Sequence, residues 1–283
     1  MNIARLEDKC NKCMLCVRDC VSGVWRNIDG TPTPVQPDLC NLCSHCIAVC
    51  PRGAIRHDGL DAARITKVNR KNLQPNVYRD IVMSRRSVRQ FKERPVPRDV
   101  IEQVLDLARY APTASNEQNV GYIVITDKKL IEKTARAIFG FASRLYDMTK
   151  KGIVKLIVQG TGLAENRYIK SMDYAQKQNR DAGRDLILHS APVLILIHTP
   201  KKTRFGCDNC NIAATTIINH AHSLGLGTCF IGFLTVSLRY SKKLRGRLGI
   251  PDDRKVHACL VMGYPSYQHA GTVSRKKPDV KWI

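Results

Sequence analysis

The sequence predicts a chain of two domains, a small cysteine-rich module followed by a larger domain that mixes helices and strands. Its 283 residues suggest about two domains at roughly 150 residues each. Eight of its twelve cysteines lie between Cys10 and Cys50. After them, apolar segments with helical spacing and short β-rich segments follow one another, separated by turns. We therefore expect a metal-binding module over residues 1–60, a linker over 61–75 and a larger domain over 76–283.

The composition is that of a globular protein. Hydrophobic residues make up 43% and charged residues 25%, as in ordinary folded domains. No apolar run approaches the 18 or so residues of a membrane span, and the longest, over 191–198, is typical of a buried strand. The first residues lack the apolar core of a secretory signal. We expect a cytoplasmic protein that does not enter a membrane.

The cysteines repeat one pattern, CxxCxxCxxxC, at an offset of 30 residues. The first copy ends at Cys20; the second ends at Cys50 and is followed by Pro51. This spacing is typical of 4Fe–4S clusters, and residues 1–60 resemble the two-cluster bacterial ferredoxins. Three thiolates of one compact loop bind one cluster, and a turn carries the fourth cysteine to the other cluster. The predicted ligand sets are Cys10, Cys13, Cys16 and Cys50 for cluster I, and Cys40, Cys43, Cys46 and Cys20 for cluster II.

Zinc is the alternative metal for such a module. Zinc favours pairs of CxxC separated by a longer gap and needs four ligands per site. Here every cysteine has a place in a doubled iron–sulfur pattern, so we favour clusters. The module departs from the ferredoxin pattern where Val21, not proline, follows Cys20. Met14 and Leu15 replace small residues, and we expect them to shield a cluster from water.

The net charge of +22 is distributed unevenly. Residues 1–60 hold seven basic and six acidic residues, which leaves 39 basic and 18 acidic residues for the remainder. Any basic surface therefore belongs to the second domain. Nucleic-acid binding is an alternative explanation, but the basic residues form no long tract and no helix-turn-helix, RRM or zinc-finger pattern is present. We expect no nucleic-acid partner.

The second domain has recognisable helices and strands. Apolar residues recur on one broad face over 98–110 and nearly all round over 208–224, where Asp208 is the expected N-cap and Gly225 the stop. Residues 226–232 are expected to bring the chain into or beside the sheet. The expected elements are helices over 77–83, 98–110 and 208–224, and strands over 121–126, 192–198 and 256–264.

Five motifs of this domain come in the order of the FMN-dependent nitroreductase family. They are the segments 85–91 (RRSVRQF), 111–118 (APTASNEQ), 190–192 (SAP), 225–232 (GLGTCFIG) and 263–265 (GYP). The resemblance covers about residues 76–283. It implies an α+β sandwich with a mainly antiparallel sheet, an intertwined homodimer, and two FMN sites at the dimer interface.

The basic residues of the first motif suit a flavin phosphate. Guanidinium groups bind a phosphate dianion through paired hydrogen bonds, and a serine hydroxyl adds a donor. By the resemblance, the stronger candidates are Arg85, Ser87 and Arg89, with Arg86 beside them. Near the C-terminus, Arg275 and Lys276 match the place where the family returns basic residues to the phosphate. A solvated tail is the alternative for that tract.

The other motifs are expected to contact the rest of the flavin. The loop over 112–116 resembles the segment that covers the flavin from the partner subunit. The backbone at Ile231 and Gly232 matches the N–H donor near flavin N5, and Gly227 allows close approach. The candidate FMN contacts in these segments are Pro112, Thr113, Ala114, Asn116, Gln118, Gly227, Ile231 and Gly232.

Residues 140–180 match the variable part of the family, which usually forms the substrate lid. Candidates to stack on a flat substrate are Phe139, Phe141, Tyr146, Tyr168 and Tyr174, with ordinary helix packing favoured for any single one. The four remaining cysteines are expected to be packed free thiols, although Cys207 and Cys210 form a CxxC. His189 is a candidate neighbour of the flavin, with a core or surface role favoured.

The combined domains favour an enzyme that converts between one- and two-electron transfer, because clusters pass single electrons and a flavin can pass two. Electrons enter from an acidic carrier such as ferredoxin or flavodoxin, or from NAD(P)H, and leave to a nitro compound, quinone or activated alkene. No GxGxxG follows a strand, so nicotinamide has no separate Rossmann domain. The alternative is an electron-transfer or redox-sensing protein without a dedicated small-molecule substrate.

Overall fold

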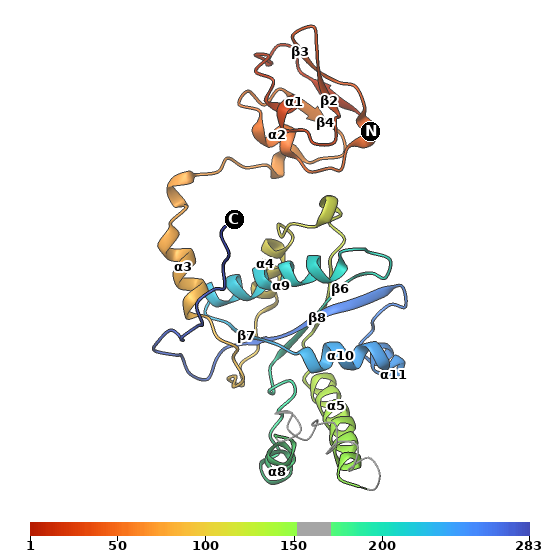
Figure 1. Cartoon of the computed structure of the whole chain (residues 1–283), viewed down its shortest axis with the longest axis vertical. Helices are drawn as coiled ribbons and strands as arrows, with labels where there is room; N and C mark the ends of the chain where they lie inside the picture. The colour runs from red at the N-terminus through yellow and green to blue at the C-terminus, as the bar shows by residue number, and fades with distance from the viewer. Residues whose placement is uncertain (152–170) are drawn as a thin grey trace. The chain divides into compact units, whose positions relative to one another are not determined.

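The computed structural model describes residues 1–151 and 171–283 (Figure 1). The chain divides into two compact units. The first comprises Met1–Gln74 together with Thr113–Glu117, and the second comprises Pro75–Pro112 together with Gln118–Ile283. Each unit has its own core, as expected for separate domains.

The N-terminal unit consists of two antiparallel strand pairs and two short helices. Strand β1 (Ile3–Arg5) pairs with β4 (Ile55–His57), and β2 (Trp25–Ile28) pairs with β3 (Thr31–Pro34). Each short helix begins inside a cysteine run: α1 spans Leu15–Asp19 and α2 spans His45–Val49. A small apolar core of Ile3, Val24, Trp25 and Ile55 holds these pieces together, with cysteines packed around it.

The 30-residue repeat of the sequence is also a repeat of backbone conformation. Lys12 and Met14 have φ angles of 55° and 61°, and their counterparts Leu42 and Ser44 have 57° and 65°. Positive φ is uncommon for residues with a side chain, and such strain is found most often at functional sites. The two cysteine loops therefore hold the same unusual shape.

The end of the first unit forms short turns, and the second unit begins with a helix. Single-turn 3-10 helices span Ala62–Arg64 and Arg70–Asn72 there, and a third, Pro37–Leu39, precedes the second cysteine run. The helix α3 (Pro75–Ser84) follows and has no buried residue. The expected helix over 77–83 is thus present, one turn longer in total.

The second unit is built on a four-stranded antiparallel sheet in the order β5-β6-β8-β7. Central strand β6 pairs with β5 from Gly121↔His198 to Ile125↔Leu194, and with β8 on its other side. The strands are β5 (Gly121–Ile125), β6 (Val193–Pro200), β7 (Gly227–Phe230) and β8 (Arg254–Gly263). The helices are α4 (Arg98–Ala108), α5 (Lys128–Thr149), α8 (Met172–Ala182), α9 (Gly206–Ser223), α10 (Gly232–Tyr240) and α11 (Lys242–Arg247), with a 3-10 turn at Ala114–Asn116.

Helices cover both faces of this sheet. In Figure 1, α4 and α9 lie on one face, and α10, α11 and α5 lie on the other. Side chains of β6 alternate between the two cores: Leu194 and Leu196 enter one, and Ile195 and Ile197 enter the other. Burial on both faces explains why β6 is apolar throughout rather than alternating, and each fully buried side chain contributes about 1.5–3 kcal/mol.

The structure confirms the α+β class and the antiparallel sheet, and it corrects one helix start. Helix α9 begins at Gly206 instead of after Asp208. A Cβ at Gly206 would lie 2.5 Å from Thr199 Oγ1, so this glycine lets the helix start against the sheet. Asp208 then falls in the first turn of α9. Its negative charge interacts favourably with the helix dipole there, although Asp208 is not the N-cap residue. Among the described residues, no helix is long and apolar enough to cross a membrane.

Candidate redox sites

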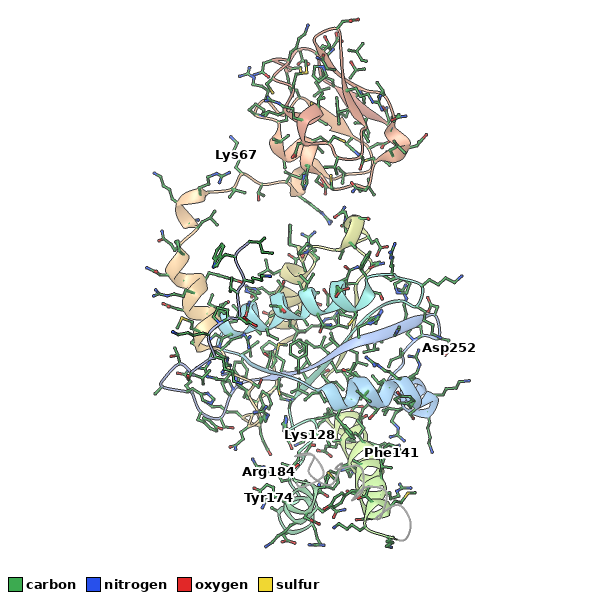
Figure 2. The ribbon with its side chains drawn as sticks, in the orientation of Figure 1. Lys67, Lys128, Phe141, Tyr174, Arg184 and Asp252 are labelled. Atoms are coloured by element: carbon green, nitrogen blue, oxygen red, sulfur yellow. The ribbon has the colours of Figure 1, made fainter. Side chains whose placement is uncertain are left out.

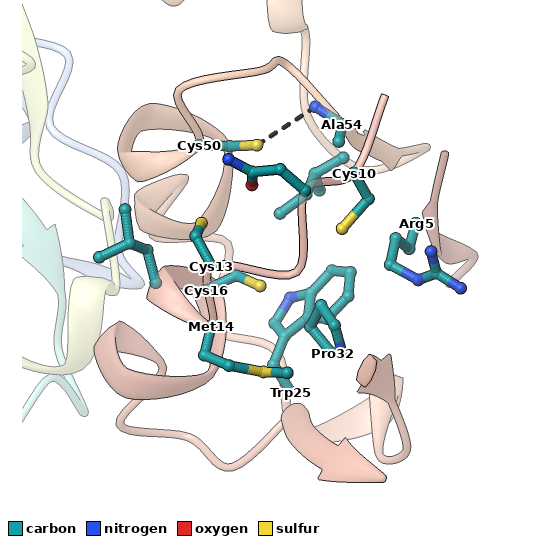
Figure 3. Close-up of a pocket in the computed structure, with 12 residues that line it drawn as sticks. Arg5, Cys10, Cys13, Met14, Cys16, Trp25, Pro32, Cys50 and Ala54 are labelled. Atoms are coloured by element: carbon teal, nitrogen blue, oxygen red, sulfur yellow. Dashed lines mark hydrogen bonds between the residues drawn. The ribbon is translucent and has the colours of Figure 1, made fainter. Parts of the chain in front are cut away.

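Two hollows in the N-terminal unit are each lined by four cysteines. Figure 3 shows the first, where the sulfurs approach one another from separate segments of the chain. Its cysteines are Cys10, Cys13, Cys16 and Cys50; those of the second are Cys20, Cys40, Cys43 and Cys46. These are the two crossed sets expected for clusters I and II. Ligation itself stays a prediction.

Backbone N–H groups point at sulfurs in both hollows. The N–H of Lys12 donates to Cys10 Sγ at 3.4 Å, and the N–H of Leu42 donates to Cys40 Sγ at 3.4 Å. The N–H of Ala54 donates to Cys50 Sγ at 3.2 Å, drawn as the dashed line in Figure 3. The positive φ at Lys12 and Leu42 places these donors. Such bonds stabilise negative charge on cluster ligands.

Trp25 lines both hollows, and the surroundings of its indole N–H indicate whether the hollows suit iron–sulfur clusters. The residue is 2% exposed, and among the residues the structure describes its indole Nε1–H has no hydrogen-bond partner. Burial raises the pKa of the Cys46 thiol to about 11, and the nearby indole N–H of Trp25 works against that rise. Buried N–H groups are nearly always paired, and the acceptors available to this one are the Cys46 sulfur and the cluster that Cys46 is predicted to bind. The residues fit the two groups.

The buried thiols are better suited to bind iron than to lose their protons without a metal. Burial raises the pKa of Cys16 as well, so a bare thiolate is disfavoured there. Metal binding replaces the thiol proton and supplies the missing positive charge. Within 1–151 and 171–283, no group of three or more His, Cys, Asp or Glu side chains forms a single-ion site.

In the second unit, the segment carrying the arginine motif docks beside β7. Ser87 forms a parallel bridge with Thr228, and the N–H of Val88 donates to Thr228 O at 2.9 Å. A Cβ at Gly227 would lie 2.5 Å from Val88 Cγ2. Gly227 is therefore required for the close approach of Val88; its predicted role in the approach to the flavin stays a prediction.

Arg89 is exposed, and its charge acts on two neighbouring groups, Cys229 and His189. Burial raises the pKa of the Cys229 thiol, and Arg89 and Ser87 oppose that rise. Burial lowers the pKa of His189; Arg89 and Arg184 lower it further, while Asp185 opposes them. His189 therefore lies near the arginine motif. Nearby in sequence, Arg85 Nε is buried and has no partner among the described residues, which fits a site for an oxyanion such as the FMN phosphate.

Arg86 is used differently from its neighbours. Its Nη1 donates to Met83 O at 2.8 Å, and its Nη2 donates to Gly271 O at 3.0 Å. The N–H of Ser266 donates to Gln90 O at 3.0 Å. These bonds fasten the C-terminal segment to the arginine motif. Further along that segment, Arg275 and Lys276 are exposed.

The loop predicted to cover the flavin is divided between the units. Pro112 and Gln118 belong to the second unit, and Thr113–Glu117, which includes Ala114, belongs to the first. Asn116 Nδ2 donates to Asn41 O at 2.8 Å within the first unit, so this amide N–H is engaged by the protein. Ser115, Asn116 and Gln118 have φ angles of 51°, 55° and 47°, which marks a strained loop.

One of the two backbone N–H groups predicted near the flavin, that of Ile231, already has a partner in the protein. The N–H of Ile231 donates to Cys259 O at 2.8 Å and extends the pairing beyond the end of β7. Gly232 is the first residue of α10, and the first N–H groups of a helix have no acceptor inside the helix. Gly232 therefore stays the candidate for the predicted N–H donor near flavin N5, which the structure does not test.

The lid candidates lie on α5 and α8, which contact each other (Figure 2). Tyr146 is 7% exposed, and its hydroxyl donates to Asp173 at 2.6 Å, so it is a packing residue. Phe141 and Tyr174, labelled in Figure 2, are 60% and 59% exposed and Phe139 is half-buried. Tyr168 lies outside the described residues.

Sequence reasoning missed two residues beside the predicted cluster ligands: Trp25, which lines both hollows, and His57, which lies beside Cys40. His57 is 6% exposed, burial lowers its pKa, and its Nε2 lies 3.4 Å from Cys40 Sγ. No motif marks either residue. The four remaining cysteines are free; Cys210, Cys229 and Cys259 are packed as expected, whereas the expectation of a packed thiol is wrong for Cys207, which is exposed.

Comparison with known proteins agrees with both units. Residues 82–264 match the Nitroreductase family, and residues 9–55 match the 4Fe-4S dicluster domain. A putative NAD(P)H nitroreductase of Bacillus subtilis, YfhC, is 56% identical over 210 residues, which cover 72% of this chain and 92% of that protein. The 4-nitrobenzoate reductase of a Nocardioides species is 26% identical over 218 residues, covering 70% and 85%. A nitroreductase with bound FMN from Desulfitobacterium hafniense has a TM-score of 0.55 at 18% identity, covering 74% of this chain and 100% of that one.

Fold, thiol sets and arginine motif together define an oxidoreductase that joins iron–sulfur clusters to an FMN-binding fold. The chain belongs to the nitroreductase family and carries an N-terminal 4Fe-4S dicluster domain.

Proposed function

We propose that this protein passes electrons from its iron–sulfur clusters, from NAD(P)H, or from both, to FMN and on to a small electron-poor substrate such as a nitro compound, quinone or activated alkene. The single observation that carries the proposal is the presence of two four-cysteine hollows in one chain with a nitroreductase domain. When bound, clusters exchange electrons singly, and FMN exchanges one or two. We also place the protein in the cytoplasm, a reducing compartment that keeps thiols available for iron.

The chain's own residues have separable tasks in this proposal. The crossed cysteine sets hold the clusters, and the apolar core around Trp25 limits the access of water. Arg85, Ser87 and Arg89 hold the flavin phosphate; Arg85 is half-buried, and its buried Nε–H has no partner among the described residues, which suits a dianion. The N–H of Gly232 supports negative charge on the reduced flavin ring.

Charge favours an acidic protein as the electron donor. The remainder of the chain beyond residue 60 holds 39 basic and 18 acidic residues, whereas residues 1–60 are nearly balanced before the clusters are counted. Eight thiolates and two oxidised cores of about +2 each add roughly −4. A basic surface steers an acidic ferredoxin or flavodoxin and raises its association rate. The name of the Bacillus subtilis relative points to NAD(P)H as the competing donor.

Anaerobic stopped-flow reduction discriminates between the donors. We expect an acidic ferredoxin to reduce the clusters faster than NADH does, and the advantage to shrink as salt rises from about 0.01 to 0.5 M, because salt screens steering. The matched control is the Cys13→Ala/Cys20→Ala variant, which lacks one predicted ligand of each cluster. Rapid bleaching of the flavin by NAD(P)H in that variant, with slow reduction by ferredoxin at every salt concentration, would exclude the steering model.

We further propose that the active species is a homodimer. The second unit exposes large apolar side chains on and next to α10, among them Phe230 at 44%, Phe233 at 44% and Val236 at 46%. Contiguous exposed apolar surface is typical of protein interfaces. Sedimentation of the FMN-loaded protein should give twice the chain mass of 31.8 kDa. We expect Phe233→Arg to weaken the dimer, whereas Ile28→Arg, at a 46% exposed apolar site of the first unit, should not. An FMN-loaded monomer would contradict the shared site.

A further inference from the structure

The imidazole of His57 lies between a backbone N–H and a predicted cluster ligand. His57 ends β4 and is 6% exposed. The N–H of Gly59 donates to its Nδ1 at 3.1 Å, and its Nε2 lies 3.4 Å from Cys40 Sγ. The ring therefore contacts the second cysteine set through one nitrogen and the chain's own backbone through the other.

The contact to Gly59 determines which nitrogen carries the proton. A backbone N–H can only donate, so Nδ1 must accept, and the neutral ring carries its proton on Nε2. That N–H points at Cys40 Sγ, and the contact is therefore a hydrogen bond from histidine to sulfur. Because the histidine N–H donates and the sulfur accepts, the bond stabilises negative charge that is added to the sulfur of Cys40.

The ring is held in this orientation by its surroundings. His57 pairs with Ile3 across the β1–β4 ladder. Asp58 follows, and its carboxylate accepts from the N–H of Asn2 at 2.8 Å. A Cβ at Gly59 would lie 3.2 Å from His57 Cε1 and 3.0 Å from Leu42 Cδ2. The close packing at Gly59 leaves the imidazole little room to turn away from Cys40.

The repeat shows that this donor is an addition to the second site. The backbone donors of Lys12 to Cys10 and of Leu42 to Cys40 are equivalent across the 30-residue offset, at 3.4 Å each. The residue equivalent to His57 is Asn27, which is exposed on β2. Cluster I has a further donor of its own, the backbone N–H of Ala54 to Cys50 at 3.2 Å. Cys40 therefore receives one backbone N–H, from Leu42, and one side-chain N–H, from His57.

We propose that His57 is a positioning residue for cluster II, whose Nε2–H bond to Cys40 raises the reduction potential of that cluster and biases an electron in the domain toward it. Reduction adds negative charge that is shared with the thiolate sulfurs, and a hydrogen-bond donor stabilises the more negative form. The inference rests on the proposed ligation of cluster II by Cys20, Cys40, Cys43 and Cys46.

Redox titration of the full, cluster-loaded chain followed by EPR tests this role. Loss of one hydrogen bond to a charged acceptor is about a tenfold effect. In His57→Leu we expect the ratio of reduced to oxidised cluster II at a given potential to fall about tenfold, equivalent to about 59 mV for one electron. His57→Gln keeps an N–H and should restore most of the difference. Asn27→Leu, at the equivalent exposed position, should leave both potentials unchanged.

Each other result overturns the assignment. An unchanged cluster II potential in His57→Leu excludes the bond as a determinant, and equal shifts of both clusters indicate a general disturbance. If Gln behaves as Leu, packing and not the N–H is responsible. The Cys13→Ala variant, which should lose cluster I, identifies the signal of cluster II. If this variant loses no cluster, the proposed assignment of cysteine ligands is wrong, and that outcome is distinct from failure of the role of His57.

A second measurement needs no substitution at His57. In wild-type protein with ¹⁵N-labelled histidine, pulsed EPR of reduced cluster II should detect coupling to a histidine nitrogen. His45 lines the hollow of Cys20, Cys40, Cys43 and Cys46, but its Nδ1 lies 3.3 Å from Asp19 Oδ2. The coupling should therefore persist in His45→Gln. Its absence from wild-type protein, or its loss in His45→Gln, would overturn the proposal even if His57→Leu does not fold.

Discussion

Replacing Cys13 and Cys50 together with alanine is expected to remove one cluster and leave the other, whereas replacing Cys13 and Cys20 is expected to damage both. The reason is the crossed arrangement, in which Cys50 lines the hollow of Cys13 and Cys20 lines the other hollow. Wild-type protein purified anaerobically should contain about eight iron and eight acid-labile sulfides per chain. The first double variant should retain about four of each and one intact 4Fe–4S EPR signal. The second should show no intact signal.

The two variants remove the same number of thiols, so each controls for the other. Cys207→Ala removes an exposed thiol of the other unit and should leave the iron content unchanged. The opposite pattern, with one cluster surviving in Cys13→Ala/Cys20→Ala and none in Cys13→Ala/Cys50→Ala, would show that each run of cysteines binds its own cluster. Tightly bound zinc in place of iron would defeat the assignment altogether.

Replacing Arg89 with alanine should weaken FMN binding by about 30- to 1,000-fold, equivalent to roughly 2–4 kcal/mol. The change removes a charge-assisted contact from a partly buried dianion. It also leaves Ser87 and Cys229 without the guanidinium beside them. Fluorescence titration with FMN gives the dissociation constant, and flavin occupancy after extensive dialysis gives an independent measure.

Arg98→Ala is the matched control for this loss of charge. Its side chain is 91% exposed and pairs with Glu102 across one helix turn at 2.7 Å, so we expect little change in FMN affinity. Arg89→Lys should recover part of the affinity, because an ammonium supplies charge without the paired geometry of a guanidinium. Full FMN occupancy of Arg89→Ala after dialysis would remove Arg89 from the phosphate site.

Patterns that depend on local spacing were predictable from the sequence. The doubled cysteine run indicated two clusters and their crossed sets, because a short loop between cysteines restricts which corners of a cluster they can reach. Apolar periodicity located β6 and α9, since both bury most of their surface against neighbours within the same domain. The start of α9 was wrong because tight packing at Gly206 against Thr199, not the preference of Asp208 for an N-cap, determines it.

Interactions between distant residues could not be derived in this way. Arg86 resembles its arginine neighbours in sequence, yet it bonds to Gly271, 185 residues away. The N–H of Ile231 is engaged by Cys259, and the amide of Asn116 by Asn41. Backbone polar groups take whichever partner folding brings near, and no spacing rule records that choice.

The sequence by itself determined the class of this protein: an iron–sulfur module with eight ordered thiols, joined to a nitroreductase-family domain with an arginine motif for phosphate. Only the tertiary structure decided how the two similar cysteine loops differ. The repeat places Asn27 and His57 at equivalent positions, but only His57 is buried, with its Nε2 3.4 Å from Cys40 Sγ. The direction of that bond depends on a local contact to Gly59, whereas the contact to Cys40 joins residues 17 apart in the sequence and exists only in the folded unit. Spacing selects the ligands, whereas burial and orientation of the groups around them set the charge that each sulfur can stabilise.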